Sequence, residues 1–438
     1  MRSLLFPIGL ALLCAQPLSA AAQAPVPIPA TPSADGPLFA SSALTLEASI
    51  RRAFQSNPGL RAAGRDLDIA AGQRMQAGLV PNPQLSYLSE GIKKDARTTT
   101  VQINQAIELG GKRGARITLA ERERDVASAD LASYRSVLRA DVVTAFFDVL
   151  TAQERLLLAQ ASQELSQKVT GAASRRVTAG KISPVEETRA RVAEASTKIE
   201  LSQAGNDLAL AKRRLAATWG SLTPIEGMVE TPAVPVGAHL TTAELLLHLP
   251  AAPQIARARS EVERQAATAE VERSRRFPDL TISLGSKRDE QIGIRQTVVG
   301  LAVPFPLFDR NQGNVLSALR RTDKARDELL AVQNKLSVEL VQASLRLNGA
   351  RSELDILRNE ILPGAQSAYE AGTKGFELGK FGFLDVLDAQ RTLFQAKTQY
   401  VRALAESHRA AADIERIVGN VELHGSLTSP QPNNKETQ

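Results

Sequence analysis

Residues 376–397 read FELGKFGFLDVLDAQRTLFQAK, and this stretch decides the fold of the chain. It predicts a helix that ends near Leu378, a tight turn at Gly379-Lys380, and a second helix that begins shortly afterwards. Glycine is the usual residue just past a helix end because it accepts a positive φ. Asp385 and Asp388 fall in the first turns of the second helix, where acidic groups suit the positive end of the helix dipole.

The same plan occurs once more, much earlier in the chain. Residues 176–186 read RVTAGKISPVE, so that Gly180-Lys181 matches Gly379-Lys380 at a separation of 199 residues. Pro184 suits an early helical position. A duplication of this length, with helices on both sides of each turn, predicts two structural repeats.

The composition favours long helices and excludes a nucleic-acid-binding protein. The 438 residues include only 4% aromatic and 23% charged residues, with a net charge of +6. Lysine and arginine alternate with aspartate and glutamate along the predicted helices, which indicates solvated helix faces rather than a basic patch.

The first residues have the features of an export signal. Residues 1–22 combine Arg2, an apolar run and a small-residue cleavage site, and we expect them to be removed. Cys14, the only cysteine, lies within this segment; a lipid-modified Cys14 is the alternative, although Leu13 is a poor neighbour for it. The mature chain would then have no thiol chemistry. Residues 23–43 are rich in proline and predict an extended linker.

Residues 44–218 form the first predicted repeat. Two helices are followed by strands at about 84–92 and 98–107, where apolar and polar residues alternate. A long helical hairpin then covers residues 113–218, because apolar residues recur at steps of seven, four and three as in a coiled coil. These are Leu131, Leu138, Val142, Ala145, Val149, Ala152, Leu156 and Ala159.

Residues 241–420 repeat this order after a connecting segment at 219–240. We expect strands at about 279–287 and 295–303 and a second long hairpin at 315–418, followed by a disordered tail at 421–438. Residues expected to face lipid are Leu280, Ile282, Leu284, Val299 and Leu301.

Four strands cannot close a barrel, and an open sheet edge in lipid leaves N–H and C=O groups unpaired. If the strands lie in a membrane, the protein must therefore oligomerise. The alternative is a periplasmic coiled-coil adaptor with a small β-domain, which leaves the four alternating strands without a purpose.

The order of elements and the 376–397 stretch resemble the TolC-like outer-membrane efflux factor family over about residues 44–420. Two further motifs, ELGGKRG at 108–114 and PFPLFDRNQG at 304–313, resemble its heavy-metal branch, the cobalt-zinc-cadmium (CzcC-like) factors. The resemblance implies a mainly α fold with a small membrane β-barrel, an internally duplicated TolC-like α-barrel/β-barrel tube whose barrel closes only in a trimer.

The resemblance also implies a function. The homotrimer would be the outer-membrane channel of a tripartite RND-type efflux system in a Gram-negative bacterium, with a long periplasmic extension. Its partners would be a periplasmic membrane-fusion protein, an inner-membrane RND pump and outer-membrane lipid. It would passively conduct divalent cations such as cobalt, zinc or cadmium; export of drugs or small organic compounds is the alternative.

The resemblance assigns roles to two sets of residues. Asp385 and Asp388 would line the pore constriction. Glu186 matches an acidic residue there, but the arginine with which it would pair is missing. Phe376 and Phe381 replace a Tyr and an Arg found in some relatives. The tips that dock on the fusion protein would be Ala179, Gly180, Lys181, Ile182 and Ser183, and Leu378, Gly379, Lys380, Phe381 and Gly382.

Residues for catalysis or cofactor binding are not found in the sequence. The Gly-Lys pairs lack the following Ser or Thr of a phosphate-binding loop. The four histidines are scattered, so we expect no high-affinity metal site. The sequence therefore predicts a protein that is not an enzyme and has no cofactor.

Overall fold

The computed structural model describes residues 44–91, 93, 96–230, 241–378, 380, 381 and 383–419. The expected signal peptide with Cys14, the linker at 23–43, Ile92, part of the connecting segment, Gly379, Gly382 and the tail lie outside the described residues, as does the side chain of Phe376.

The described residues of the first half of the chain form four helices and two strands. In order these are α1 (Leu46–Ser56), α2 (Pro58–Ala77), β1 (Gln84–Glu90), β2 (Thr98–Ile107), α3 (Lys112–Thr178) and α4 (Pro184–Ala217). Asn57 separates α1 from α2, and its side chain caps α2 by accepting the backbone N–H of Leu60 at 2.7 Å. The 67 residues of α3 span roughly 100 Å at 1.5 Å per residue.

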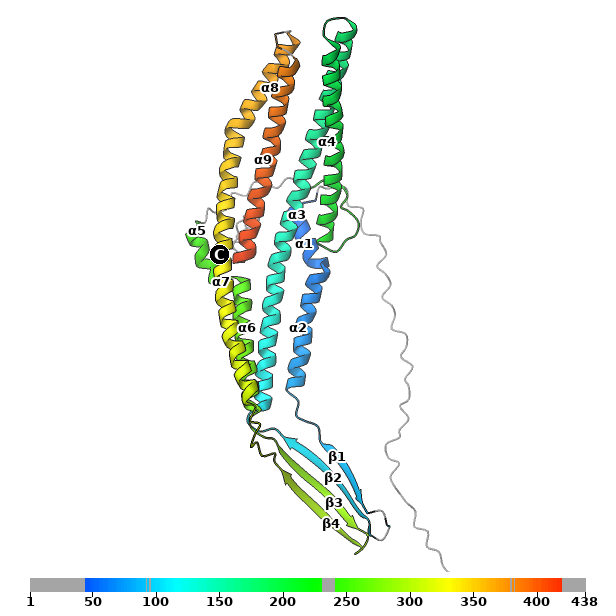
Figure 1. Ribbon diagram of the computed structural model, residues 1–438, viewed down its shortest axis with the longest axis vertical. Coiled ribbons are helices and arrows are strands. Elements are labelled where there is room, and N and C mark those ends of the chain that lie inside the picture. The colour runs from blue at the N-terminus through cyan, green and yellow to red at the C-terminus, as the bar shows by residue number, and fades with distance from the viewer. Residues whose placement is uncertain are drawn as a thin grey trace, which may run out of the picture. The chain divides into compact units, whose positions relative to one another are not determined.

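The second half repeats this order (Figure 1). Its elements are α5 (Thr242–His248), a short 3₁₀ turn (Leu249–Ala251), α6 (Pro253–Ser274), β3 (Leu280–Asp289), β4 (Ile294–Ala302), α7 (Gln312–Ile356), a π-helical turn (Leu357–Ile361), α8 (Leu362–Glu377) and α9 (Phe383–Val418).

The long helix expected to begin near Val315 begins at Gln312 and is not regular throughout. The π-helical turn at Leu357–Ile361 interrupts it and ends two positions before Pro363. Proline has no N–H to donate and its ring clashes with the carbonyl group four residues earlier, so a wider turn accommodates it. Pro363 was the signal for this interruption, and the sequence analysis did not use it.

The four strands form one antiparallel sheet in the order β1-β2-β3-β4. Strands β2 and β3 come from different repeats and pair along their whole length, from Thr98 opposite Asp289 to Ile107 opposite Leu280. In the part of the chain that the structure describes, β1 and β4 are edge strands, each with one neighbouring strand.

The register gives the sheet one apolar and one polar face, because directly paired residues project to the same side. Leu85, Ile103, Leu284 and Val299 form one row across the sheet, and Ile282 lies opposite Leu301. We call this side the apolar face; its members are Leu85, Tyr87, Val101, Ile103, Ile107, Leu280, Ile282, Leu284, Val299 and Leu301. The other side carries polar residues, such as Ser86 and Asn104, whose side chains are joined by a hydrogen bond of 3.1 Å.

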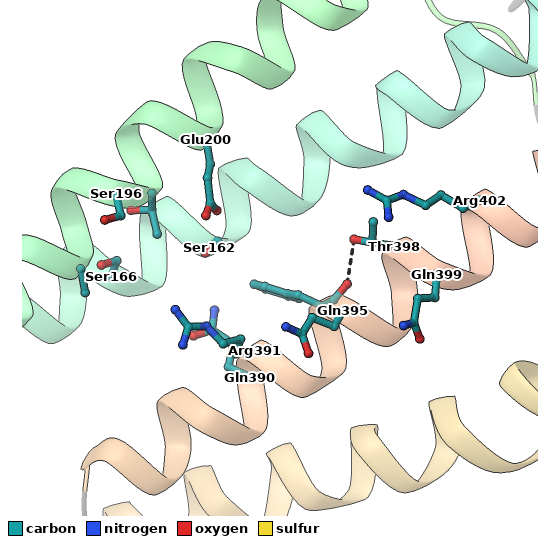
Figure 2. Close-up of a pocket in the computed structure, with 13 residues that line it drawn as sticks. Ser162, Ser166, Ser196, Glu200, Gln390, Arg391, Gln395, Thr398, Gln399 and Arg402 are labelled. Atoms are coloured by element: carbon teal, nitrogen blue, oxygen red, sulfur yellow. Dashed lines mark hydrogen bonds between the residues drawn. The ribbon is translucent and has the colours of Figure 1, made fainter.

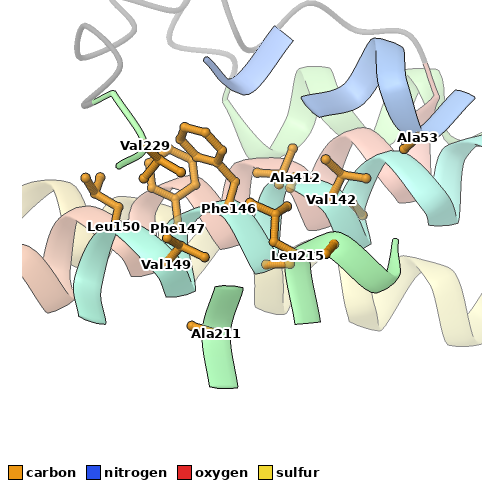
Figure 3. Packing of buried hydrophobic residues seen from close by; sticks show 14 of the residues in the cluster. Ala53, Val142, Phe146, Phe147, Val149, Leu150, Ala211, Leu215, Val229 and Ala412 are labelled. Carbon is orange, nitrogen blue, oxygen red and sulfur yellow. The ribbon is translucent and has the colours of Figure 1, made fainter. Parts of the chain in front are cut away.

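The larger hydrophobic core surrounds the middle of α3 (Figure 3). Phe146 and Phe147 are fully buried there, with an edge-to-face arrangement of their rings at 5.6 Å. They pack with residues of α1, α4 and α9, including Ala53, Leu215 and Ala412. A second core joins α5, α6, α7 and α9, so that α9 contributes to both.

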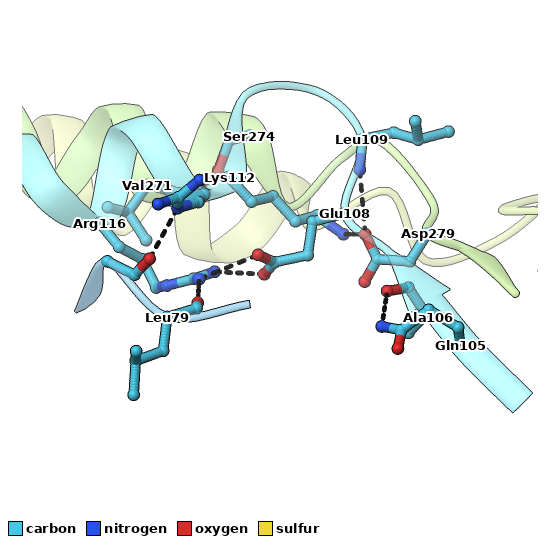
Figure 4. A network of polar contacts seen from close by, with 12 residues as sticks. Leu79, Gln105, Ala106, Glu108, Leu109, Lys112, Arg116, Val271, Ser274 and Asp279 are labelled. Atoms are coloured by element: carbon cyan, nitrogen blue, oxygen red, sulfur yellow. Dashed lines mark hydrogen bonds and ion pairs between the residues drawn. The ribbon is translucent and has the colours of Figure 1, made fainter. Parts of the chain in front are cut away.

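The connection between sheet and helices is held by a polar network (Figure 4). Arg116 of α3 pairs with Glu108, which follows β2, and also donates to the carbonyl of Leu79 at 3.2 Å. The hydrogen bond to Glu108 raises the pKa of Arg116. Lys112 contacts Asp279, which precedes β3, at 2.6 Å. The ELGGKRG motif at 108–114 therefore joins the two repeats where strands meet helices.

The second motif, PFPLFDRNQG at 304–313, connects the start of α7 to the end of α6 by hydrogen bonds. Asn311 has a positive φ of 56°, and its side-chain amide donates to both the backbone and the carboxylate of Glu272 at 2.8 Å. Asparagine tolerates this left-handed conformation better than most residues.

Within the described residues, no helix combines the length and the hydropathy needed to cross a membrane.

Candidate functional site

The first hairpin tip is a turn of five residues between α3 and α4. Lys181 donates its N–H to the carbonyl of Arg176, and Gly180 donates to that of Val177, both at 2.9 Å. This pair of bonds is a Schellman motif, which requires a left-handed residue; Gly180 has φ of 66°. Ser183 then caps α4 by accepting the N–H of Val185 at 3.3 Å.

Most of this tip is exposed to solvent. Ala179, Gly180, Lys181 and Ser183 are exposed, and Ile182 is half-buried. A Cβ atom built on Gly180 would meet no other atom within 4 Å, so the positive φ, and not crowding, is the reason for glycine.

The acidic residues after this tip are paired on their own helix. Glu186 contacts Arg189 at 3.0 Å, and Glu187 contacts Arg191 at 2.6 Å. The partner of Glu186 is therefore a neighbour one turn away, which the sequence analysis did not consider.

The second tip makes the same backbone hydrogen bond. Lys380 donates its N–H to the carbonyl of Gly375 at 2.8 Å, five residues back, as Lys181 does to Arg176. Phe381 also donates to the Gly375 carbonyl at 3.3 Å. Leu378, Lys380 and Phe381 are exposed. Each of the two turns that the sequence analysis matched by their Gly-Lys pairs thus makes an equivalent hydrogen bond, from the lysine N–H to the carbonyl five residues back.

Asp385 and Asp388 both lie exposed in the first turns of α9. They are three positions apart and so share one side of the helix, while Val386 between them is buried. Such a pair presents two carboxylates to the same surroundings.

A groove of about 590 Å³ lies between the first hairpin and α9 (Figure 2). Small polar residues of α3 and α4, among them Ser162, Ser166 and Ser196, face Arg391 and Arg402 of α9. Glu200 of α4 is the acidic residue of its lining. The groove begins directly after Asp388 along α9, and the sequence analysis missed it because its residues come from segments about 200 positions apart.

One ion pair near the groove stabilises the ionised carboxylate of Glu194 on α4. Lys198 contacts Glu194 at 2.9 Å. Hydrogen bonds, first from Lys198 and then from Thr170 of α3, lower the pKa of Glu194. Glu194 therefore stays ionised at neutral pH.

The half of α9 that is remote from the tip is held by both long helices. Arg409 pairs with Asp148 of α3, and Arg346 of α7 contacts Asp413 at 2.9 Å. Buried His408 stacks on Phe147 of α3 with ring centroids 3.9 Å apart. The helix that carries Asp385 and Asp388 is thus anchored at one end.

Within the described part of the chain, no group of three or more His, Cys, Asp or Glu residues is arranged to hold a metal ion. The geometry offers exposed turns, a polar groove and exposed carboxylates, which suit contacts with other proteins and weak, transient contacts with ions.

Comparisons with known proteins agree with this geometry. The family model described as "Outer membrane efflux protein" matches residues 49–221 and 247–420, which are the two repeats. The chain is 46% identical over 422 residues to the cobalt-zinc-cadmium resistance protein CzcC of Cupriavidus metallidurans, covering 96% of this chain and 100% of that protein. It is 25% identical over 436 residues to the outer membrane protein TolC of Escherichia coli, covering 90% and 87%.

A solved structure has the same fold. A membrane protein from Pseudomonas aeruginosa superimposes with a TM-score of 0.73 at 20% identity, over 85% of this chain and 93% of that one.

Proposed function

The chain belongs to the outer membrane efflux protein family, and we propose that it acts as a trimeric duct that conducts divalent heavy-metal cations from the periplasm to the outside. The observation that carries the cargo assignment is the 46% identity to the cobalt-zinc-cadmium resistance protein over nearly the whole of both chains. The TolC-like fold and the outer-membrane location follow from the family itself.

The trimer is supported by the open sheet. Among its described residues, one chain provides four strands and leaves an edge of both β1 and β4 without a neighbour. In lipid, each unpaired backbone group costs several kcal/mol, so the edges need partners. Three copies joined edge to edge would exceed the roughly eight strands with which closed membrane sheets begin. The apolar face would then meet lipid and the polar face would line the lumen.

The tips are the proposed contacts with the rest of the export assembly. Ala179, Gly180, Lys181, Ile182 and Ser183, together with Leu378, Gly379, Lys380, Phe381 and Gly382, would meet a periplasmic membrane-fusion protein that links the duct to an inner-membrane RND pump. Support comes from the exposure of the described tip residues other than half-buried Ile182, and from the equivalent backbone hydrogen bond that each turn makes.

Asp385 and Asp388 are the proposed lining of the narrow end of the duct. Three protomers would give two rings of carboxylates, which favour cations and release them again. Glu186, already paired with Arg189, would contribute less.

Metal tolerance tests the proposed cargo. The gene is deleted in its host and restored on a plasmid, and growth is measured over a series of zinc, cobalt and cadmium concentrations and over a series of cationic dyes. The deletion should lower tolerance to at least one of the three metals and leave dye tolerance unchanged. Lower tolerance to the dyes alone would assign the duct to organic compounds instead.

A further inference from the structure

One row of side chains crosses the sheet near its loop end. Ser89 lies opposite Thr99, Thr99 opposite Arg288, and Arg288 opposite Arg295. Directly paired residues project to the same side, so two hydroxyl groups and two guanidinium groups stand side by side across all four strands. We call these four residues the rim row.

The rim row continues the apolar face. The adjacent row contains Tyr87, Val101, Ser286 and Thr297, and the row after it contains Leu85, Ile103, Leu284 and Val299. Arg288 is four residues from Leu284, which is about 14 Å at ~3.4 Å per residue. Along this face, the side chains thus change from apolar in the Leu85 row, through mixed in the Tyr87 row, to polar and basic in the rim row.

The rim row has an excess of positive charge. Arg288 and Arg295 are both exposed and directly opposite each other, an arrangement that is unfavourable for like charges. Arg288 is partly neutralised by Glu290, with Nε 2.9 Å from the carboxylate. Within the described residues, Arg295 has no carboxylate in ion-pair distance. An anion between the two arginines would relieve their repulsion.

We propose that the rim row binds the phosphate groups of lipid headgroups in the leaflet around the loop end of the sheet. This inference rests on the proposed function, since it takes the apolar face to be in lipid. Arginine suits phosphate because its planar donors form two parallel hydrogen bonds with it, and the hydroxyls of Ser89 and Thr99 can donate to remaining phosphate oxygens. The phosphate belongs to a lipid because acyl chains below it would cover the apolar rows of the same face.

The opposite face provides a matched control. Lys287 precedes Arg288 in β3, but it pairs with Thr100 and Gln296 and projects to the polar face. Lys287→Gln removes the same charge from the same strand without touching the rim row. Glu290→Gln removes the carboxylate that competes for Arg288.

The test is native mass spectrometry of the purified full-length protein in detergent. The protein is incubated with equal amounts of phosphatidylglycerol and monogalactosyldiacylglycerol, a lipid without phosphate, and the lipids retained on each assembly are counted. Wild type should prefer phosphatidylglycerol. Arg295→Gln should lower that preference about five-fold, taking roughly 1 kcal/mol per basic residue at an anionic surface. Arg288→Gln should lower it less, Lys287→Gln should not lower it, and Glu290→Gln should raise it.

Two results would overturn the proposal. One is an unchanged preference in the Arg288→Gln/Arg295→Gln double variant. The other is complete displacement of phosphatidylglycerol by millimolar inorganic phosphate, which would assign the row to soluble anions. The same spectra give the mass of the assembly, so the outcomes separate: a wild-type monomer contradicts the trimeric duct, whereas a trimer without lipid preference contradicts the rim row alone.

Discussion

The ring of Phe381 lies against the bare backbone of Gly375, so that a Cβ atom on Gly375 would come within 2.0 Å of the ring Cδ2. Gly375 also accepts the N–H of Lys380 that closes the second tip. Gly375→Ala should therefore displace Phe381 and distort the tip, at a cost below the ~1–3 kcal/mol of an overpacked core, because the half-exposed ring can move into solvent. We expect metal tolerance to fall while trimers remain in the outer membrane.

Two variants make this prediction specific. Gly349→Ala in α7 meets nothing within 4 Å and should leave tolerance unchanged. Phe381→Ala combined with Gly375→Ala removes the clash and should restore the backbone of the tip, as read from protease sensitivity of the turn. An unaltered protease pattern in Gly375→Ala alone would contradict the packing argument.

The first tip depends on backbone conformation instead of packing. Gly180→Val places a β-branched residue at φ of 66°, where such residues are strained by about 1–2 kcal/mol or more. Export and site-specific cross-linking to the fusion protein should be lost. Native mass spectrometry should still show an intact trimer. Gly205→Ala in α4, where a Cβ meets nothing within 4 Å, is the control. Normal cross-linking and export in Gly180→Val would show that this turn is not the docking surface.

The apolar face predicts a position-dependent cost for charge in the sheet. Ile282→Lys places an ammonium group opposite Leu301 on this face, and should cost about 2–4 kcal/mol if it meets the middle of the bilayer. Gln102→Lys is the comparison, since Gln102 lies opposite Gly285 on the polar face. Urea unfolding of both variants in lipid vesicles gives the two free energies, and equal costs would show that the two faces do not meet different solvents.

Strand positions and helix ends could be predicted from the sequence because their signals are local. Alternation of apolar and polar residues indicated strands at 98–107 and 295–303, and the structure has them at Thr98–Ile107 and Ile294–Ala302. The turn at the first Gly-Lys pair could be predicted because it requires a left-handed residue, which Gly180 supplies. The predicted fold class and family are confirmed by the comparisons.

What the sequence analysis missed depends on contacts between distant segments. The seam through Leu138, Val142 and Val149 was predicted, but Phe146 and Phe147 lie outside its spacing and are still fully buried, because α3 is covered from several sides. The contact of Phe381 with Gly375 and the groove along α9 likewise depend on side-chain placement, which periodicity does not reveal.

A capping box gives α5 a defined pH dependence. The backbone N–H of Thr241 donates to the Glu244 carboxylate at 2.7 Å, and this bond lowers the pKa of Glu244. Since the folded state then binds the proton more weakly than the unfolded state, the cap stabilises α5 fully above the ordinary glutamate pKa. Its contribution is lost as the pH falls through the lower folded value.

Hydrogen exchange measures this effect locally. After correction for intrinsic exchange rates, protection of the α5 amides should decrease under acidic conditions in wild type. Glu244→Gln retains an acceptor without a titrating group, so its protection should be independent of pH over the same range. Parallel profiles for the two proteins would show that Glu244 does not contribute the pH dependence.

The carboxylates at the start of α9 provide the test of the conducting path. Asp385 and Asp388 are exposed on one side of the helix, and in a trimer they would form two acidic rings. Replacing both by Ala should weaken the cation preference of single channels in planar bilayers and reduce block by divalent ions, because acidic rings concentrate cations. Asp66→Ala with Asp327→Ala removes the same charge from exposed positions on α2 and α7 and should leave both properties unchanged. If the Asp385/Asp388 variant retains its cation selectivity and its block by divalent ions, the two carboxylates do not face the pore. Their role is then limited to stabilising the start of α9 by a few tenths of a kcal/mol each.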